Sequence, residues 1–373
     1  MSPHRRLALW LFAVAVGTNV PTPLLLLYRD TLGMSESAVT ALFGVYAAGL
    51  VPALVLAGPA ADRFGRRRVA IPATVGAAVA SLLFVLAADS VPLLFGARWL
   101  QGVVSGTCFS VGSAWLSETS PGRGARTAAV AMTGGFSLGP FTSGVLGEFG
   151  PAPATLSYLL HVAVVGIGLV VVAPVAETLA VRAVGVRAPS GNPLRPGAGW
   201  EALTVVAPLA VCVYAFPASA INAVPLLVGL PSRPILLTGI LAGLTLGAGT
   251  LVAPLQARLG RQTAAWGAGL GAVGFAFATV GAAGPKLLLL PAALLMGSGG
   301  GLALAAGLSR LPALAREGRL ATVSAGFYAS AYLGFGTPFL LAEVRGALGI
   351  VVPLGVLAGL FGLLSLRQAY AAA

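Results

Sequence analysis

Long apolar segments recur along the whole chain of 373 residues. Each is about 20 residues long, the length that an α-helix needs to cross a hydrocarbon core of ~30 Å. Strands of a membrane barrel would be shorter and would alternate in polarity. We therefore predict an all-α polytopic membrane protein with twelve transmembrane helices. Charged residues or Pro and Gly separate the apolar segments, which cover 7–28, 38–60, 69–88, 92–116, 127–147, 155–175, 200–224, 235–256, 263–282, 287–309, 320–342 and 348–366.

The composition excludes a soluble domain and several kinds of site. Hydrophobic residues make up 57% of the chain and charged residues 9%, whereas soluble domains carry about 25% charged residues. The net charge of +12 would suggest nucleic-acid binding in a soluble protein, but here we expect it to set membrane orientation, with no nucleic acid bound. Cys108 and Cys212 lie inside apolar segments, so we predict no disulfide framework, no metal site and no cofactor.

Positive charge is distributed unequally between the two ends of the predicted helices. With the N-terminus in the cytoplasm, seventeen of the 22 Lys and Arg residues fall on the cytoplasmic side and four on the outer side. Cytoplasmic loops of membrane proteins are enriched in Lys and Arg. We therefore predict a multi-pass protein of the plasma (cytoplasmic) membrane with both termini cytoplasmic, in contact with membrane lipids. Pro21 and Pro23 stand where a signal peptide would have small cleavage-site residues, so we expect the first segment to be retained.

A polar, basic segment rich in Pro and Gly divides the chain near its middle. It predicts a six-helix half over 1–176, a cytoplasmic linker over 177–198 and a second six-helix half over 199–373. A shift of 195 residues places Gly102 on Gly297, which supports two related halves. Parallel repeats of this kind are typical of one large class of transporters. The same shift aligns Arg63 with Arg258, Gly65 with Gly260, Arg66 with Arg261 and Gly106 with Gly301.

The loop between the second and third apolar segments gathers one acid and four arginines. A carboxylate at the end of a helix, such as Asp62, needs a positive partner, which Arg66 can supply. Gly65 permits a tight turn, and Gly58 would let a neighbouring helix approach closely. The loop sequence GPAADRFGRRRVA resembles the signature loop of the major facilitator superfamily, with matches at Gly58, Asp62, Arg63, Gly65, Arg66 and Arg67.

This resemblance implies a conformational latch that bridges the two halves on the inner side when the carrier opens outward. The alternative is that the arginines only anchor the topology. In the second half Ala257 stands at the position equivalent to Asp62, so only one complete latch is predicted.

The fourth segment reads RWLQGVVSG and resembles the second signature of the same superfamily, with Arg98 and Gln101 at pattern positions. A guanidinium inside a membrane helix is costly unless it is paired or hydrated, so Arg98 is a functional candidate. The resemblance implies a role in proton coupling or in organising the cavity. The alternative is that Arg98 extends to the outer surface.

The fifth segment reads GGFSLGPFTSGVLGE and resembles a motif of drug–proton antiporters, although Ser143 replaces one glycine. The eighth segment carries a similar stripe of small residues, and the resemblance places these two segments face to face. Such stripes suit helices that slide or rock, although ordinary helix packing also uses glycine. The residues concerned are Gly135, Gly139, Pro140 and Gly144 in the fifth segment and Gly239, Gly243 and Gly247 in the eighth.

The resemblance also implies a central cavity lined by the first, fourth, seventh and tenth segments with help from others. Candidate proton-coupling residues are Asp30 and Arg98, since no acid stands clearly at mid-membrane. A lone Arg98 without a cavity acid favours neutral or anionic substrates. The candidate substrate residues are Asn19, Thr22, Arg98, Gln101, Phe136, Tyr214, Asn222 and Tyr328.

These features favour a secondary transporter that exports a small amphiphilic molecule, drug-like or a secondary metabolite, by proton antiport. The alternative is a carrier of the same superfamily for a sugar, amino acid or organic anion, working by symport or facilitated diffusion. A non-transporting receptor is disfavoured by the short loops. An enzyme is disfavoured because no catalytic set stands at useful spacing. The resemblance implies a monomer.

Overall fold

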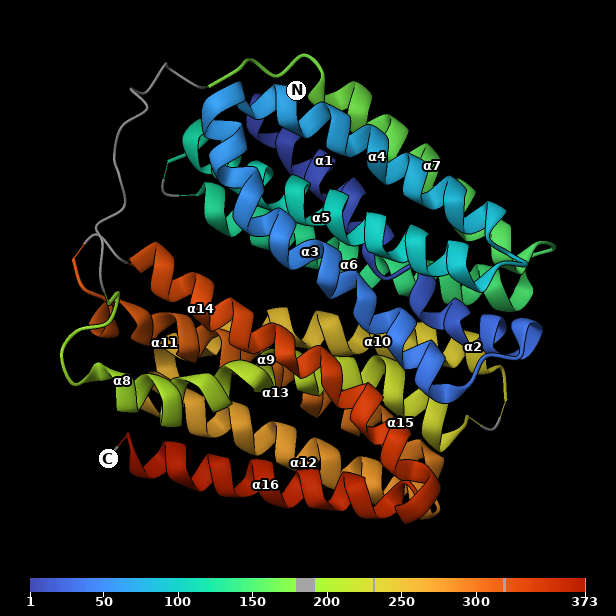
Figure 1. Cartoon of the computed structure of the whole chain (residues 1–373), viewed down its shortest axis with the longest axis vertical. Coiled ribbons are helices and arrows are strands. Elements are labelled where there is room, and N and C mark those ends of the chain that lie inside the picture. The colour runs from blue at the N-terminus through green and yellow to red at the C-terminus, as the bar shows by residue number, and fades with distance from the viewer. Residues whose placement is uncertain (122, 179–191, 231, 318–319, 373) are drawn as a thin grey trace. The chain divides into compact units, whose positions relative to one another are not determined.

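Helices account for nearly all of the chain that the computed structural model describes, namely residues 1–121, 123–178, 192–230, 232–317 and 320–372 (Figure 1). Within these ranges no strand is present, and Leu194 and Ala315 form an isolated bridge. The predicted all-α class is therefore confirmed.

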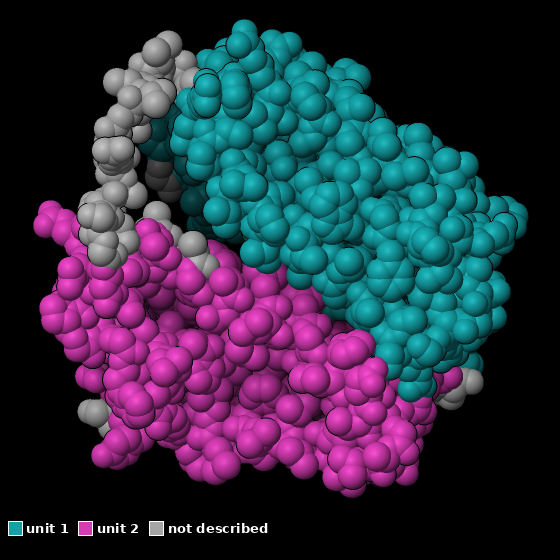
Figure 2. Space-filling model, in the orientation of Figure 1, with its two compact units in different colours: residues 1–184, 232–243 teal, residues 185–231, 244–373 magenta. Residues whose placement is uncertain are grey.

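The chain divides into two compact units, which Figure 2 shows in different colours. Unit 1 comprises residues 1–184 and 232–243, and unit 2 comprises residues 185–231 and 244–373. Most of the predicted linker, 179–191, lies outside the described residues. The domain boundaries inferred from the sequence stay a prediction.

The described part of unit 1 contains seven complete helices and the first part of another. They are α1 (Pro3–Thr18), α2 (Pro21–Leu32), α3 (Glu36–Phe64), α4 (Arg66–Leu86), α5 (Val91–Thr119), α6 (Gly124–Phe149), α7 (Pro153–Val172) and the beginning of α10 (Pro234–Val252).

The described part of unit 2 contains the remaining helices, several of which are short or are 3₁₀ or π segments. They are α8 (Ala198–Glu201), η1 (Ala202–Val206), α9 (Ala207–Ala218), η2 (Ser219–Val228), η3 (Ala253–Leu255), α11 (Gln256–Leu259), η4 (Gly260–Gln262), α12 (Thr263–Ala283), η5 (Lys286–Leu288), α13 (Leu289–Leu314), α14 (Leu320–Leu333), η6 (Gly334–Gly336), α15 (Thr337–Leu348) and α16 (Val351–Tyr370).

Each of the predicted apolar ranges coincides with one of these helices or with a run of consecutive ones. In the described residues, eight helical segments are long and apolar enough to cross a membrane. α5 and α6 are not among them because many of their residues are Gly, Ser and Thr, and α5 also carries Arg98 and Gln101. The observed helices agree with twelve spans, and the count itself stays a prediction.

Glycines bring helices of each unit into backbone contact. In unit 1, a Cβ on Gly102 of α5 would overlap the backbone oxygen of Tyr46 in α3. In unit 2, a Cβ on Gly297 of α13 would overlap the backbone oxygen of Thr245 in α10. The shift of 195 residues relates these two glycines. The sequence repeat therefore corresponds to a repeat of close helix packing.

Candidate functional site

The first apolar segment is not one continuous helix, because a proline interrupts its hydrogen bonding. α1 ends at Thr18 and α2 begins at Pro21. Pro21 has no N–H to donate to the carbonyl of Gly17, four residues earlier. The N–H of Thr22 donates to the carbonyl of Asn19 at 3.1 Å, rather than to that of Thr18. The break therefore leaves the Thr18 carbonyl without its usual helical donor, and the Gly17 carbonyl accepts instead from the N–H of Val20 at 3.3 Å.

Arg98 and Gln101 of α5 donate hydrogen bonds to these two carbonyls. Arg98 Nη1 donates to the Thr18 carbonyl oxygen at 2.7 Å and to Gln101 Oε1 at 2.5 Å. Gln101 Nε2 donates to the Gly17 carbonyl oxygen at 2.6 Å. A spacing of three residues places both side chains on one face of α5. The cation also faces the negative end of the α1 dipole. Together the two side chains hold the break in place.

Arg98 is enclosed by protein, with only 1% of its surface exposed. The guanidinium carbon lies 4.6 Å from the ring centre of Tyr46 and 5.7 Å from that of Phe43. In the described part of the chain, no ion pair joins Arg98 to a carboxylate. The idea that Arg98 extends to an exposed surface is therefore wrong. Its charge is surrounded by carbonyl oxygens, an amide and aromatic rings, which makes cation–π attraction a substantial contribution.

Two predicted cavity residues, Asn19 and Thr22, belong to the same site. Asn19 lies in the break itself, and Thr22 lies on the first turn of α2; both are buried. The Thr22 hydroxyl has no hydrogen-bond partner among the described residues. Phe136 of α6 is half-buried and packs edge-on against Phe109 of α5, with ring centres 5.4 Å apart. Phe109 lies about three helical turns beyond Arg98, so Phe136 contacts a different part of α5.

Asp30, the predicted proton carrier, lies near the end of α2 in an exposed ion pair. Its side chain is 63% exposed, and its carboxylate lies 2.8 Å from Arg29 Nε. α2 does extend past Tyr28, so Asp30 belongs to the first apolar segment. Its role in proton coupling stays a prediction.

In the loop between α3 and α4, Arg66 joins two acidic side chains. Arg66 Nη2 lies 2.7 Å from Asp62 Oδ1 and 2.8 Å from Glu118 Oε1, and the Arg66 side chain is 8% exposed. Asp62 lies on the last turn of α3, and Glu118 lies on the last turn of α5. Glu118 also accepts a hydrogen bond from the Thr178 hydroxyl at 2.5 Å. The loop is therefore part of an ion-pair network inside unit 1.

Glu177 binds the N-terminus of α4. Its two carboxylate oxygens accept hydrogen bonds from the backbone N–H groups of Arg66 and Arg67, each at 3.0 Å. The unpaired N–H groups and positive dipole end of a helix stabilise a carboxylate there. Gly65 turns the chain with a φ of +101°, and a Cβ there would lie 2.7 Å from Glu177 Oε2. The positive φ therefore favours glycine at this position, and a Cβ there would force the Glu177 side chain to shift.

Glu118 and Glu177 were not among the site residues predicted from the sequence. A signal for them existed, because each stands two residues beyond an apolar segment whose predicted inner end is at 116 or 175. Alternate spans of a helical membrane protein end at the same face. Acids just beyond such ends are therefore candidates to meet the arginines of an inner loop.

Arg63 and Gly58, two predicted latch residues, take no part in this network. Arg63 is exposed, and its guanidinium lies over the ring of the neighbouring Phe64 at 5.2 Å. A Cβ on Gly58 would lie 3.7 Å from Ser110 Oγ, which is an ordinary contact. The close helix approach expected at Gly58 is therefore not found, because the neighbouring helix leaves room for a side chain.

The glycines of α6 pack against two helices. A Cβ on Gly135 or Gly139 would collide with backbone atoms of α1 at Val16. Further along α6, a Cβ on Gly144 would lie 2.9 Å from the Cα of Gly239 in the first part of α10. Part of the α6 stripe thus faces α1 rather than α10.

The contact between α6 and the first part of α10 involves two glycines of α10. A Cβ on Gly239 would lie 2.5 Å from the Pro140 carbonyl oxygen, and one on Gly243 would lie 3.2 Å from that of Ser137. Pro140 has no N–H for the carbonyl four residues earlier, which loosens α6 beside this contact. Gly247 lies on the part of α10 that belongs to unit 2.

The predicted cavity residues of unit 2 include an aromatic cluster. Tyr214 of α9 stacks on Tyr332 with ring centres 4.7 Å apart and lies 5.0 Å from the ring of Phe335. Tyr328, one turn before Tyr332 on α14, is half-buried. Asn222 of η2 is buried, and its Oδ1 has no hydrogen-bond partner in the described structure. Asn222 therefore has an acceptor available for a ligand.

Comparison with known proteins identifies the family. The model of the Major Facilitator Superfamily matches residues 7–338. Multidrug resistance protein MdtL of Klebsiella pneumoniae (strain 342) is 44% identical over 88 residues, which is 24% of this chain and 22% of that protein. The protein of the same name from Escherichia coli (strain K12 / DH10B) is 42% identical over 88 residues, with the same coverage. The chain thus matches less than a quarter of the length of these relatives.

Solved structures share the fold over nearly the whole chain. A POT family transporter in complex with 5-aminolevulinic acid has a TM-score of 0.79 at 12% identity, covering 99% of this chain and 95% of that one. A mutant of the nucleoside transporter NupG has a TM-score of 0.74 at 13% identity, covering 100% and 99%. At these identities the likeness concerns the fold alone. Since the family model covers most of the sequence, this multi-pass membrane protein is a transporter rather than an enzyme, and it belongs to the major facilitator superfamily.

Proposed function

We propose that this carrier exports a small amphiphilic molecule, drug-like or a secondary metabolite, by proton antiport with alternating access. One observation carries this proposal: the α6 segment that resembles the antiporter motif makes backbone-close contacts with α1 and α10 through its glycines. Such smooth contacts let helices shift without side chains interlocking. The partial relatives named multidrug resistance protein MdtL support the drug-like substrate class.

The substrate we propose is neutral or anionic. Arg98 is buried, and its guanidinium has no carboxylate partner among the described residues. A lipophilic cation would be repelled by this charge, whereas an anion or a polar neutral group would not. The unpaired Thr22 hydroxyl near the same break, and Asn222 in unit 2, are the groups we propose for substrate hydrogen bonds.

We place the coupling of protons to transport at the break in the first segment. There two side chains of α5 donate hydrogen bonds to the last carbonyls of α1, at Gly17 and Thr18. Hydrogen bonds from side chains to these carbonyls can be exchanged at a lower free-energy cost than the backbone hydrogen bonds of a continuous helix. We further propose that the protein works as a monomer with both termini in the cytoplasm.

The direct test is transport in proteoliposomes with an imposed pH gradient. A trapped pH dye is followed while neutral, anionic and cationic amphiphiles are added one at a time. We expect a neutral or anionic compound to cause proton movement. Arg98→Met should reduce the rate at least about tenfold, equivalent to ~1.4 kcal/mol. Arg68→Gln, at an exposed arginine of α4, should stay within about twofold.

Three results would contradict parts of this proposal. Substrate movement without any proton signal would indicate facilitated diffusion of an ordinary metabolite, such as a sugar, amino acid or organic anion. Proton and substrate moving in the same direction would indicate symport. Proton movement with cations alone would remove the substrate assignment and leave antiport standing.

A further inference from the structure

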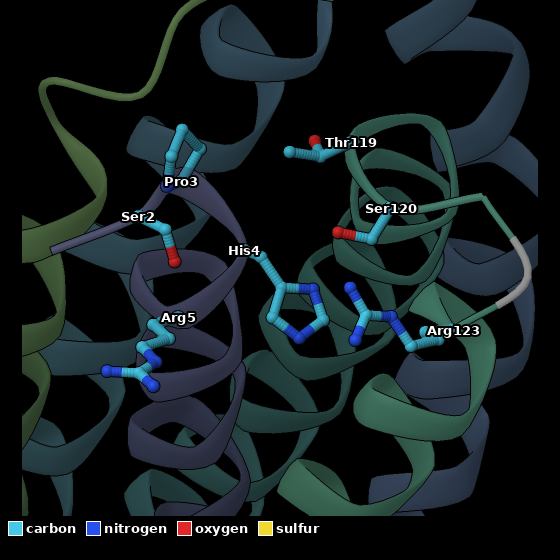
Figure 3. Close-up of a pocket in the computed structure, with 7 residues that line it drawn as sticks. All are labelled: Ser2, Pro3, His4, Arg5, Thr119, Ser120 and Arg123. Carbon is cyan, nitrogen blue, oxygen red and sulfur yellow. The ribbon is translucent and has the colours of Figure 1, made fainter.

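We propose that unit 1 binds a phosphate group, from an anionic phospholipid or from a soluble phosphate compound, in a cavity beside the start of α1. The cavity has a volume of about 530 Å³ and lies between the first turn of α1, the end of α5 and the start of α6 (Figure 3). It is separate from the Arg98 site and from the network around Arg66. The polar residues that line it are Ser2, His4, Arg5, Thr119, Ser120 and Arg123.

The lining of the cavity is basic. It includes two arginines, a histidine and three hydroxyl groups, and no carboxylate is among the described residues that line it. Figure 3 shows the His4 ring and the Arg123 guanidinium side by side, with the Ser120 hydroxyl directed toward them, whereas Arg5 points away. In the described structure no ion pair neutralises Arg123. Two basic groups that lie next to each other without an acid favour an anion between them.

His4 supplies an additional unsatisfied group. Its Nε2 lies 3.3 Å from the Thr127 hydroxyl oxygen. The Thr127 hydroxyl itself donates to the Arg123 carbonyl oxygen at 3.1 Å, so its oxygen accepts the hydrogen of His4 Nε2. The other ring nitrogen, Nδ1, is enclosed and has no partner among the described residues.

The helix ends add to the positive potential. α1 has Ser2 as its N-cap residue and α6 has Arg123, and neither N-terminus receives a side-chain cap. The helices are 16 and 26 residues long, so each has a full dipole whose positive end borders the cavity. Phosphate oxygens bind well where backbone N–H groups, hydroxyls and an arginine fork converge. The cavity offers the guanidinium fork of Arg123 and the hydroxyl groups of Ser2 and Ser120, which favours a phosphate over a simple halide ion.

The test separates the two sources of phosphate. In the first arm, inorganic phosphate is titrated into the full chain in nanodiscs of phosphatidylcholine, and heat is measured by calorimetry. In the second arm, the buffer contains no phosphate salt and the nanodiscs contain increasing phosphatidylglycerol, while the unfolding temperature is recorded. Arg123→Gln removes the fork that we assign to the ligand. Arg126→Gln is the matched control, because Arg126 is exposed on the same helix and does not line the cavity.

In whichever arm shows binding, we expect Arg123→Gln to weaken the binding of phosphate or of phosphatidylglycerol at least about fivefold. Arg126→Gln should change the same binding less than about twofold. Binding in the first arm alone assigns soluble phosphate, and binding in the second alone assigns a lipid headgroup. His4→Gln provides a second variant, with the same expected direction, if Arg123→Gln does not fold. No binding in either arm, or an equal loss with Arg126→Gln, would overturn the site. Since transport is not measured, failure here leaves the export proposal untouched.

Discussion

The loop between α3 and α4 of unit 1 and its counterpart in unit 2, related by 195 residues, have different local structures. In unit 1, α3 continues to Phe64, and Gly65 alone turns the chain into α4. In unit 2, the corresponding stretch is divided into η3, α11 and η4 before α12 begins. One loop is a single sharp turn, and the other is a series of short helical pieces.

The charges of the two loops differ as well. Arg66 contacts two carboxylates and is almost fully buried. Its counterpart Arg261 is exposed, with Ala257 where the acid would be, and lines a cavity of about 880 Å³. Arg310, which borders the same cavity, donates to the neutral amide of Gln368 at 2.9 Å. In unit 1, acidic side chains thus bind the arginine of the loop and the start of α4. In unit 2, the corresponding arginine instead lines a cavity together with Arg310. A repeat of sequence here does not imply a repeat of the latch.

The largest difference in the free energy of unfolding is expected between substitutions of the two equivalent arginines, Arg66 and Arg261. Arg66→Met leaves two carboxylates without their cation and should lower the free energy of unfolding by about 2 kcal/mol, less than for a fully buried pair because Asp62 is partly solvated. Arg261→Met should stay within about 0.5 kcal/mol. Chemical denaturation in detergent measures both. Equal losses would show that the ion pairs do not distinguish the loops.

The two turn glycines give the next comparison. Gly65→Ala combines a φ of +101° with a collision against the Glu177 carboxylate, so we expect a loss of about 1.5 kcal/mol. Gly260→Ala has a φ of +52° with a ψ of −126° and no atom within 4 Å of the new Cβ, so only backbone strain remains and we expect a smaller loss. The same unfolding measurement applies. A larger loss at Gly260 would mean that the turn in unit 2 is the more constrained one.

A smaller effect is expected from the carboxylate that binds α4. Glu177→Gln keeps the shape but removes the charge at the helix N-terminus, which should cost about 1 kcal/mol. Glu201→Gln, at an exposed acid beside the unit 2 cavity, should change stability by less than about 0.5 kcal/mol. Thermal unfolding of both variants at low and high salt provides the check, since salt should reduce only the Glu177 effect. If salt has no influence, hydrogen bonding rather than charge holds the helix end.

The smallest effect comes from adding the missing acid to unit 2. Ala257→Asp places a carboxylate four residues before Arg261, the same spacing as Asp62 and Arg66. An exposed pair at this spacing stabilises a helix by about 0.3–0.5 kcal/mol. A double-mutant cycle with Arg261→Gln isolates that pair. A coupling of zero would show that the broken helix of unit 2 keeps the two side chains apart.

Most helical segments could be read from the sequence, since hydropathy together with the positions of charged residues, Pro and Gly locates them. A bilayer forces each crossing segment to satisfy its own backbone hydrogen bonds, so long apolar runs have few alternatives to helix. The turn at Gly65 was also predictable, because the positive φ observed there is one that glycine readily adopts.

The partners of the charged residues were less predictable. Arg98 and Gln101 were recognised as special, yet the sequence does not show that they bind the carbonyls of Gly17 and Thr18. Nor does it show that Glu118 contacts Arg66, because residues 52 apart in the chain meet only when helices pack.

The sequence by itself determined the helical class, the approximate ends of the spans, the repeat and the family, because these depend on local hydropathy and on short motifs. The tertiary structure alone decided which donors of α5 bind the carbonyls at the break in the first segment. It also decided that three acids close the loop of unit 1, whereas a cavity opens at the loop of unit 2. Hydrogen bonds and ion pairs act over a few ångströms, so only the packing of distant helices can bring these partners together.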